Sequence, residues 1–158
     1  MSDQLFVPAD FTAPDGLTTG EFRLEPLGPQ HNTADYAAWT ASTGHIRATP
    51  GFPWGGWPHQ MSLADNLGDL QRHAQDFTAR CGFTYTVLST ATGEVIGCVY
   101  NYPPRDQGPD HPQAGGMRPS GPGYARTMRR WTRCSTTPSA PWLDRDWAFR
   151  SIQYAPRN

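Results

Sequence analysis

Residues 62–82 carry the pattern that most limits the possible folds of this chain. Apolar side chains recur there at intervals of four, three, four and three residues, at Leu63, Leu67, Leu70, Ala74 and Phe77. This spacing places them on one face of a helix. Ser62 precedes the series with Asp65 three residues later, which is close to a capping box, and Gly82 follows it. The pattern predicts an amphipathic helix that begins after Ser62 and ends at Gly82.

Two strands are expected directly after this helix. Residues 84–89 (TYTVLS) and 94–102 (EVIGCVYNY) are rich in β-branched and aromatic residues, which favour strands. The short connection around Thr92 and Gly93 predicts that the two strands pair as a hairpin.

The remaining elements have weaker signals. Residues 21–27 (EFRLEPL) alternate apolar and polar side chains, which predicts a strand. Asn32 or Thr33 can cap a helix that stops before Pro50. Residues 150–154 (RSIQY) predict a last short strand. Residues 1–20 are expected to form a loosely ordered arm, and residues 21–158 a single domain with an irregular basic Pro/Gly/Arg segment at 104–141.

Composition excludes several classes of protein. The chain has 158 residues and a net charge of −1, so charge alone gives no reason to expect nucleic acid or an anionic membrane as a partner. Three cysteines without a CxxC pair indicate neither a disulfide framework nor a zinc site. No apolar run approaches 18 residues. A cytoplasmic protein is therefore expected, and no oligomeric state is predicted.

The order of strand, two helices and hairpin resembles that of the GNAT (N-acetyltransferase) superfamily. FRLEPLGPQH at 22–31 and GEVIGCVYNYP at 93–103 resemble the first strand and the central strand-turn-strand of that family. HIRATPGFP followed by MSLADNLGDLQRH is similar to its two helices around a substrate-side loop. The resemblance implies an α/β (α+β) fold with a mixed central sheet and two helices between strands 1 and 2. It also implies an acyl-CoA-dependent N-acyltransferase that uses acetyl-CoA as cosubstrate and a small-molecule or peptide amine as acceptor.

One signature of that family has no counterpart here. Its fourth strand runs into a Q/R-x-x-G-x-G/A loop and a helix that hold the pyrophosphate of acetyl-CoA, an arrangement typical of anion binding. At this place the chain reads GPGYAR, at 121–126, without an amphipathic helix after it. We therefore expect the fourth strand and third helix to be degraded or missing, and we assign no catalytic or cofactor-binding residue. The alternative function is a non-catalytic, GNAT-derived binding module or the inactive product of a damaged gene.

Residues 117–141 hold five arginines and no Asp or Glu. One interpretation is a frame-shifted version of the acetyl-CoA-binding strand and helix. In a neighbouring frame, residues whose codons begin with T yield apolar residues, and from Trp131 onward these would lie at helical spacing and join the in-frame Trp142. The other interpretation is a genuine basic loop. Because no recognisable nucleic-acid module accompanies the arginines, a nucleic-acid partner is not expected.

Four aromatic residues are candidates for substrate binding. Trp54 and Trp57 lie in the Gly/Pro loop of residues 49–60, where aromatic side chains either line a ligand cleft or cover the helices as part of the core. Tyr100 and Tyr102 follow Gly97 on the strand that, in the family, faces acceptor and thioester. Both hydroxyls can donate a hydrogen bond, but strand alternation gives at least one of them a packing role. Histidines 45, 59 and 73 lack a second ligand at suitable spacing, so no metal site is expected.

Overall fold

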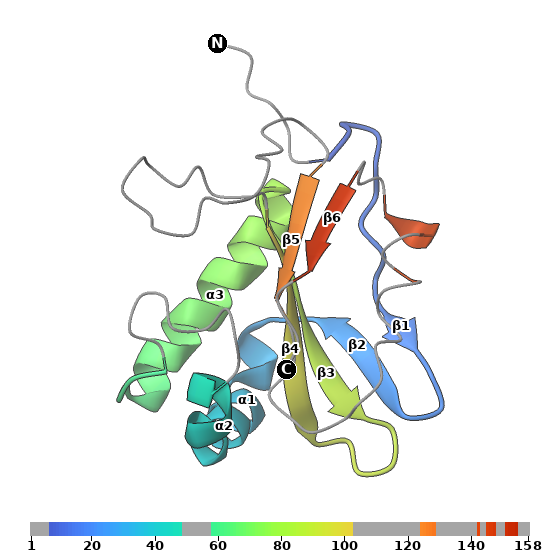
Figure 1. Cartoon of the computed structure of the whole chain (residues 1–158). Coiled ribbons are helices and arrows are strands. Elements are labelled where there is room, and N and C mark those ends of the chain that lie inside the picture. The colour runs from blue at the N-terminus through green and yellow to red at the C-terminus, as the bar shows by residue number, and fades with distance from the viewer. Residues whose placement is uncertain are drawn as a thin grey trace.

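The computed structural model describes residues 7–48, 58–102, 124–128, 142, 145–147 and 151–154. Six strands in these ranges form one sheet in the order β1-β2-β3-β4-β5-β6 (Figure 1). They are β1 (Leu17–Thr18), β2 (Phe22–Pro26), β3 (Phe83–Ser89), β4 (Val95–Tyr102), β5 (Tyr124–Met128) and β6 (Ser151–Tyr154). Neighbouring strands are antiparallel except for β5 and β6, which are parallel. The sheet is therefore mixed, as expected.

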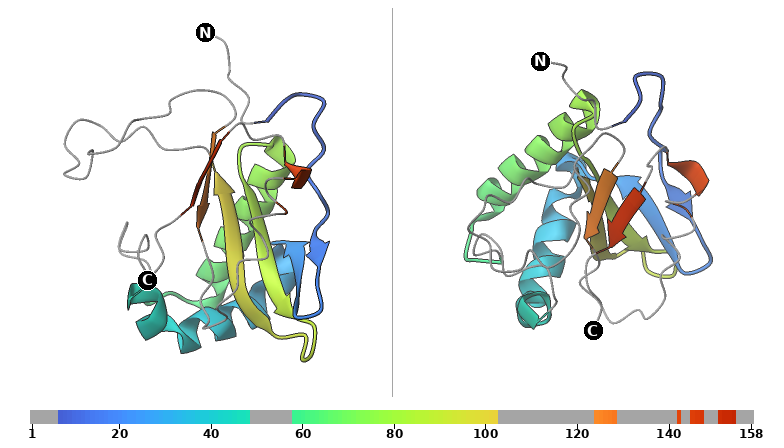
Figure 2. Two further views of the ribbon diagram at one scale, coloured as in Figure 1. Left: turned by 45° about the vertical axis from the view of Figure 1, so that its right-hand side comes forward. Right: turned by 45° about the horizontal axis from the view of Figure 1, so that its top comes forward.

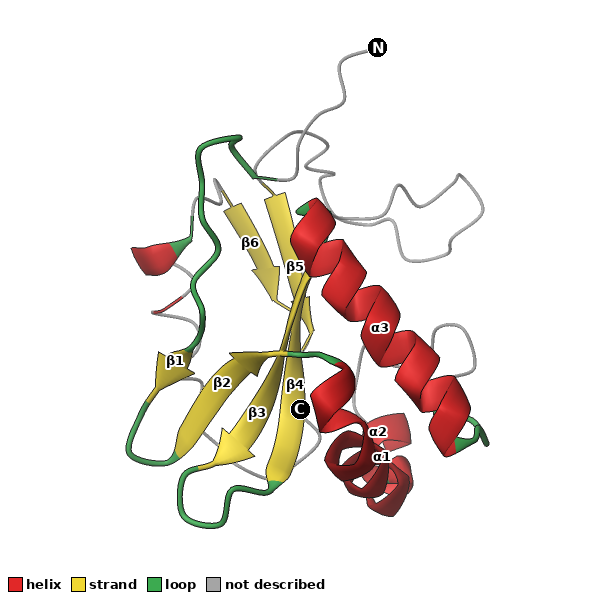
Figure 3. Ribbon diagram, turned by 180° about the vertical axis from the view of Figure 1, so that it is seen from behind, coloured by secondary structure: helices red, strands yellow, loops and turns green. Residues whose placement is uncertain are grey.

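The principal helices lie between β2 and β3. They are the 3-10 turn η1 (Pro29–His31) and the helices α1 (Asn32–Ala41), α2 (Thr43–Ala48) and α3 (Leu63–Ala79). Figures 1 and 3 show α1 and α3 side by side against one face of the sheet. The predicted α+β fold class is confirmed. No helix in the described ranges is both long and apolar enough to span a membrane.

Helix α3 begins as its sequence predicts. The Ser62 hydroxyl accepts from the Asp65 amide at 3.1 Å, and the Asp65 carboxylate accepts from the Ser62 amide at 3.0 Å. This reciprocal pair satisfies two amides that a helix start leaves unpaired. The helix ends at Ala79 because Arg80 adopts the left-handed conformation, with φ 61°. The helix thus ends slightly before Gly82, the end expected from the sequence.

The single helix expected from residue 32 or 33 to Pro50 is divided in two. Ser42 separates α1 from α2 and has a non-helical backbone conformation. The hydroxyls of Thr40 and Thr43 donate to the carbonyls of residues three and four positions earlier. Such back-bonding competes with the helical hydrogen-bond ladder and bends helices. The threonines on both sides of Ser42 account for the break.

The β3–β4 hairpin confirms the predicted pair of strands. Gly93 has a φ of +73° at the turn, a conformation that glycine adopts at little cost. The register shifts between Val87 and Leu88, where Gly97 and Val95 are the successive partners on β4. The bulge interrupts the alternation of side chains along β4, so that residues beyond it point to the other side of the sheet than regular alternation would give. As a result Cys98, Tyr100 and Tyr102 point toward the helices.

Two hydrophobic clusters fill the two sides of the sheet. The cluster under the helices contains Leu27, Trp39, Ile46, Leu70, Leu88, Val95 and Cys98. The second contains Val7, Phe22, Leu24, Phe83, Tyr85, Val87, Val99, Trp142 and Trp147. Phe11 and Trp147 have ring centroids 5.5 Å apart, and Figure 2 shows the N-terminal segment beside the short helical piece near residue 145. Residues 7–18, part of the arm expected to be loosely ordered, therefore contribute to the core.

Residues 124–128 form strand β5 at the place of the fourth strand that the sequence resemblance implies. We expected it to be degraded or missing, but β5 pairs with β4 at Tyr100, Asn101 and Tyr102 and with β6 along four positions. A strand needs only compatible backbone conformations to pair, so the basic composition of this stretch does not prevent it. Residues 129–141, where the third helix was expected to be degraded or missing, lie outside the described ranges.

Candidate functional site

The helix-facing side of β4 brings two of the predicted site residues beside polar side chains of α3. The Tyr102 hydroxyl donates to Asp76 Oδ2 at 2.9 Å. The same hydroxyl oxygen lies 2.8 Å from His73 Nδ1. Thr84 Oγ1, on the neighbouring strand β3, lies 3.2 Å from that nitrogen. Tyr102 therefore joins α3 to the end of the hairpin through a chain of hydrogen bonds.

Proton counting along this chain assigns the tautomer of His73. An ionised carboxylate only accepts, so the Tyr102 proton points toward Asp76. The Tyr102 oxygen can then bond His73 only as an acceptor, and Nδ1 must carry the imidazole proton. In the neutral ring Nε2 is then the unprotonated nitrogen. It has no hydrogen-bond partner among the residues that the structure describes.

The surroundings keep this imidazole neutral. Burial is the main cause that lowers the pKa of His73, and the nearby Arg72 guanidinium lowers it further. Asp76 and Asp69 act in the opposite direction without cancelling the effect. Burial also raises the pKa of Tyr102 well above its usual value, and the Asp76 carboxylate adds to this. Both groups are therefore uncharged near neutral pH.

Tyr100 lies deeper on the same face of β4. Its ring centroid is 5.6 Å from that of His73, and it packs against the cluster under the helices. Burial raises the pKa of Tyr100, with Cys98 and Asp35 contributing. Because the hydroxyl stays protonated, Tyr100 can serve as a hydrogen-bond donor but not as a base.

A buried carboxyl lies below this aromatic pair. Asp35 on α1 is only 3% exposed, and its Oδ1 accepts from the Cys98 thiol at 3.7 Å. Its Oδ2 accepts from Asn66 Nδ2 at 3.1 Å, and Asn66 Oδ1 in turn accepts from the Trp39 indole at 2.9 Å. Burial raises the pKa of Asp35. This network is closed to solvent and links α1, α3 and β4, so we assign it a structural role.

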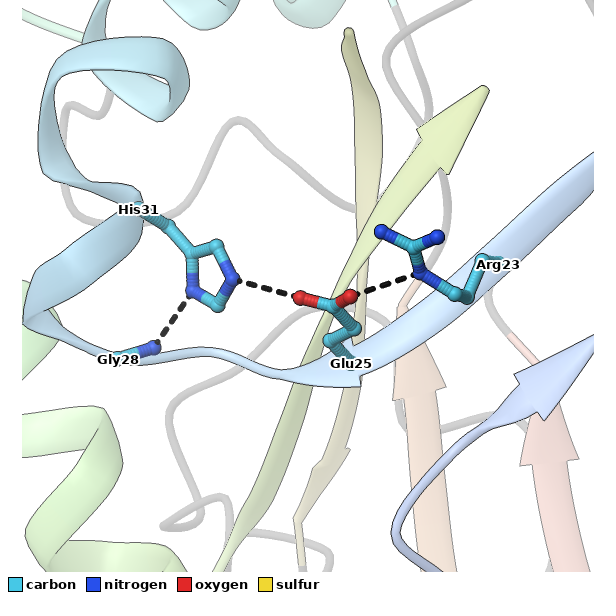
Figure 4. A network of polar contacts seen from close by, with 4 residues as sticks. All are labelled: Arg23, Glu25, Gly28 and His31. Carbon is cyan, nitrogen blue, oxygen red and sulfur yellow. Dashed lines mark hydrogen bonds and ion pairs between the residues drawn. The ribbon is translucent and has the colours of Figure 1, made fainter. Parts of the chain in front are cut away.

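A second histidine is fully engaged. His31 Nδ1 accepts from the Gly28 amide at 3.1 Å, and His31 Nε2 lies 3.1 Å from Glu25 Oε2 (Figure 4). The other oxygen of Glu25 accepts from Arg23 Nε at 2.7 Å. The hydrogen bond with His31 is the main cause that lowers the pKa of Glu25. Because both ring nitrogens of His31 are occupied, this group clamps the turn after β2 and has no nitrogen left for proton transfer.

A shallow pocket lies between the first helices and the start of α3. Its volume is about 260 Å³ and its lining includes Tyr36, Trp39, Thr40, Thr43, Arg47, His59, Gln60 and Met61. Two of its polar groups already bond carbonyls, because Tyr36 donates to Met61 at 2.9 Å and Arg47 to Pro58 at 3.1 Å. Trp54 and Trp57, the other predicted site residues, lie outside the described ranges. Within the described part of the chain, no group of three or more His, Cys, Asp or Glu side chains could hold a metal ion.

Sequence reasoning identified only part of this site. It selected Tyr100 and Tyr102, but it treated His73 only as a metal ligand without a partner. Asp76 follows His73 by three positions and lies on the same face of the helix, so the helical pattern already contained that neighbour. Their connection to Tyr102 spans 29 residues of sequence and depends on how the hairpin packs.

Comparisons with known proteins add little to this geometry. No family model matches the sequence, and no curated protein matches it. One solved structure, described as "Putative GnaT-family acetyltransferase from Bordetella pertussis", aligns with a TM-score of 0.45 and 15% sequence identity. The alignment covers 72% of this chain and 56% of that chain, so the chain spans little more than half of its neighbour. A likeness of this size does not establish a family.

Proposed function

We propose that this chain is a GNAT-like, acyl-CoA-dependent N-acyltransferase that transfers an acetyl group to an amine acceptor. The observation that carries the proposal is the sheet, in which antiparallel β2, β3 and β4 lead to the parallel pair of β5 and β6. The resembling family receives the pantetheine arm of acetyl-CoA beside the corresponding pair of strands. In that family the helices after the first strand bracket a substrate-side loop, and here α1, α2 and α3 lie between β2 and β3.

The described residues supply one part of such a site. Strands β5 and β6 pair without interruption from Tyr124–Ser151 to Thr127–Tyr154, so an opening for the cosubstrate would lie beyond these positions. The segment that would hold the pyrophosphate lies within residues 129–141, outside the described ranges.

The test is acetyl-CoA-dependent release of free thiol in the presence of a panel of amines. The panel should include polyamines, aminoglycosides, amino acids and short peptides with free N-termini. We expect at least one acceptor to give thiol release together with a product that is heavier by one acetyl group. A chain that binds acetyl-CoA but acetylates no member of the panel would contradict the enzymatic proposal.

The second candidate is a non-catalytic, GNAT-derived binding module. Its supporting observation is the sequence RRWTRCSTTPSAP at residues 129–141, which follows β5 where the family has a glycine-rich phosphate loop and which contains no glycine. An unrelated anion should then stabilise the chain as much as acetyl-CoA does. A protein that binds acetyl-CoA selectively should instead gain thermal stability as the concentration of this ligand rises above its Kd.

A further inference from the structure

We propose that His73 is the general base of this site and that Tyr102 and Asp76 are positioning residues that orient its ring. The inference rests on the proposed acyl-transfer function and extends it to a specific nitrogen, His73 Nε2. Its basis is the chain Asp76–Tyr102–His73, with contacts of 2.9 and 2.8 Å. The chain fixes the proton on Nδ1 and leaves the lone pair on Nε2.

The hydrogen bonds of His73 resemble those of other histidines that act as general bases. A catalytic imidazole needs a hydrogen bond at one nitrogen that holds its tautomer, while the other nitrogen faces the reacting group. Here the Tyr102 hydroxyl takes the orienting position, and Asp76 fixes the direction of that hydroxyl. His31 provides an internal contrast, because both of its nitrogens are bonded.

The charged and titratable groups around His73 come from each element that packs against it. They are Asp69, Arg72 and Asp76 on α3 and Tyr100 and Tyr102 on β4, and β3 adds the uncharged hydroxyl of Thr84. Burial lowers the pKa of His73, so the base is in its neutral form over most of the physiological range.

The proposed step balances as follows. His73 Nε2 takes one proton from the ammonium group of the acceptor, which leaves a neutral amine. The amine nitrogen attacks the thioester carbonyl of acetyl-CoA and forms the C–N bond. As the C–S bond breaks, the second surplus proton on nitrogen passes to the leaving thiolate. The products are the acetylated amine, coenzyme A thiol and a protonated His73, which returns its proton to water.

The principal test compares wild type with His73→Asn between pH 5 and 9. Asparagine can place its amide nitrogen near the position of Nδ1 and so can keep the bond to Tyr102, but it has no group at the position of Nε2. We expect kcat to fall at least a hundredfold, which is the usual contribution of a general base, and the acidic limb of the profile to disappear. The control is His45→Asn, since His45 is an exposed histidine on α2.

A second pair of variants tests the positioning residues. Asp76→Asn and Tyr102→Phe should lower kcat less than His73→Asn does, and both should shift the acidic limb of kcat/KM. Asp10→Asn, the same change at an exposed position that is not among the groups acting on the His73 pKa, should leave the limb in place. Tyr102→Phe removes no charge that acts on the His73 pKa, so a merely structural role for Tyr102 would change the unfolding temperature without moving this limb.

Nitrogen NMR of the imidazole rings shows which nitrogen of His73 carries the proton, and it does so whether or not the protein acetylates an amine. At pH 7 we expect a protonated Nδ1 and an unprotonated Nε2 for His73. An active wild type whose His73→Asn variant keeps its rate and its acidic limb would overturn the inference alone. A wild type that acetylates no amine would overturn the proposed function and with it the catalytic role, and a protonated Nε2 at pH 7 would overturn the geometric basis.

Discussion

The ring of Tyr102 occupies the space that a β-carbon on Gly82 would need. Gly82 is the last residue of the connection between α3 and β3, and ring carbons of Tyr102 are the atoms nearest to the position that its β-carbon would take. This close approach holds the ring where its hydroxyl can reach both Asp76 and His73. The glycine at this connection thus serves the site as well as the chain reversal.

Gly82→Ala should therefore destabilise the protein and disturb the site together. The added methyl group forces the Tyr102 ring away, and overpacking of this kind costs about 1–3 kcal/mol. Urea unfolding measures this cost. Gly68→Ala is the matched control, since a β-carbon there meets nothing within 4 Å, and alanine in mid-helix should stabilise by about 0.5–1 kcal/mol. Equal effects of the two changes would contradict the close packing at Gly82.

His73 should make the protein less stable in mild acid. Burial lowers its folded pKa below the ordinary value of 6.5, so the unfolded chain binds more protons in the window below pH 6.5. The free energy of unfolding must then fall as pH falls through this window. Urea titrations at pH 7 and pH 5 should show a larger loss for wild type than for His73→Asn. Equal losses would mean that His73 titrates alike in both states.

Asp35 should act in the opposite direction. Burial raises its folded pKa above the ordinary value of 3.8, so above that pH the folded state binds more protons than the unfolded chain. The contribution of Asp35 to the free energy of unfolding therefore falls as pH rises from its unfolded pKa to its folded pKa. The free energy of unfolding of Asp35→Asn should therefore increase relative to that of wild type as pH rises from 4 to 7. Asp10→Asn, a change at an exposed position, should show the same pH dependence as wild type. A constant difference across this range would contradict the buried carboxyl.

A hydrogen bond of Tyr85 on β3 links the N-terminal segment, residues 7–18, to the sheet. Its hydroxyl donates to the Pro14 carbonyl at 2.6 Å, and the residue has no exposed surface. Tyr85→Phe leaves this carbonyl without its donor and should cost about 1 kcal/mol. Hydrogen exchange should quicken at the Phe11 amide, which bonds Pro8 in the same segment, more than at β3 or β4. Uniform quickening across the sheet would instead indicate that the segment unfolds only with the whole domain.

The sequence was most informative where the signals were local. The capping pair Ser62 and Asp65 and the turn at Gly93 lie within a few residues of the elements they define, so α3 and the hairpin were predicted to within a few residues. The break at Ser42 was missed because it depends on hydroxyls that bond back to the helix. The link between His73 and Tyr102 could not be read from spacing, since the packing of α3 on the hairpin creates it.

The frame-shift interpretation of residues 117–141 stays a prediction. Strand β5 shows that part of this stretch pairs with the sheet in the printed sequence. Sequencing the coding DNA from Gln113 to Trp142 tests the interpretation directly. A base lost or gained near Gly116 and compensated near Pro141 would support it, whereas a clean read of the printed frame would leave only an older genomic change.

The most direct test of acyl-CoA-dependent transfer is calorimetric titration of the full chain with acetyl-CoA. Adenosine 3′,5′-bisphosphate serves as a control for binding of the nucleotide end alone. We expect saturable binding with one site per chain, tighter than the control because the pantetheine arm and acetyl group add contacts beside β5 and β6. No heat of binding at millimolar acetyl-CoA, together with an unchanged unfolding temperature, would contradict the proposed function.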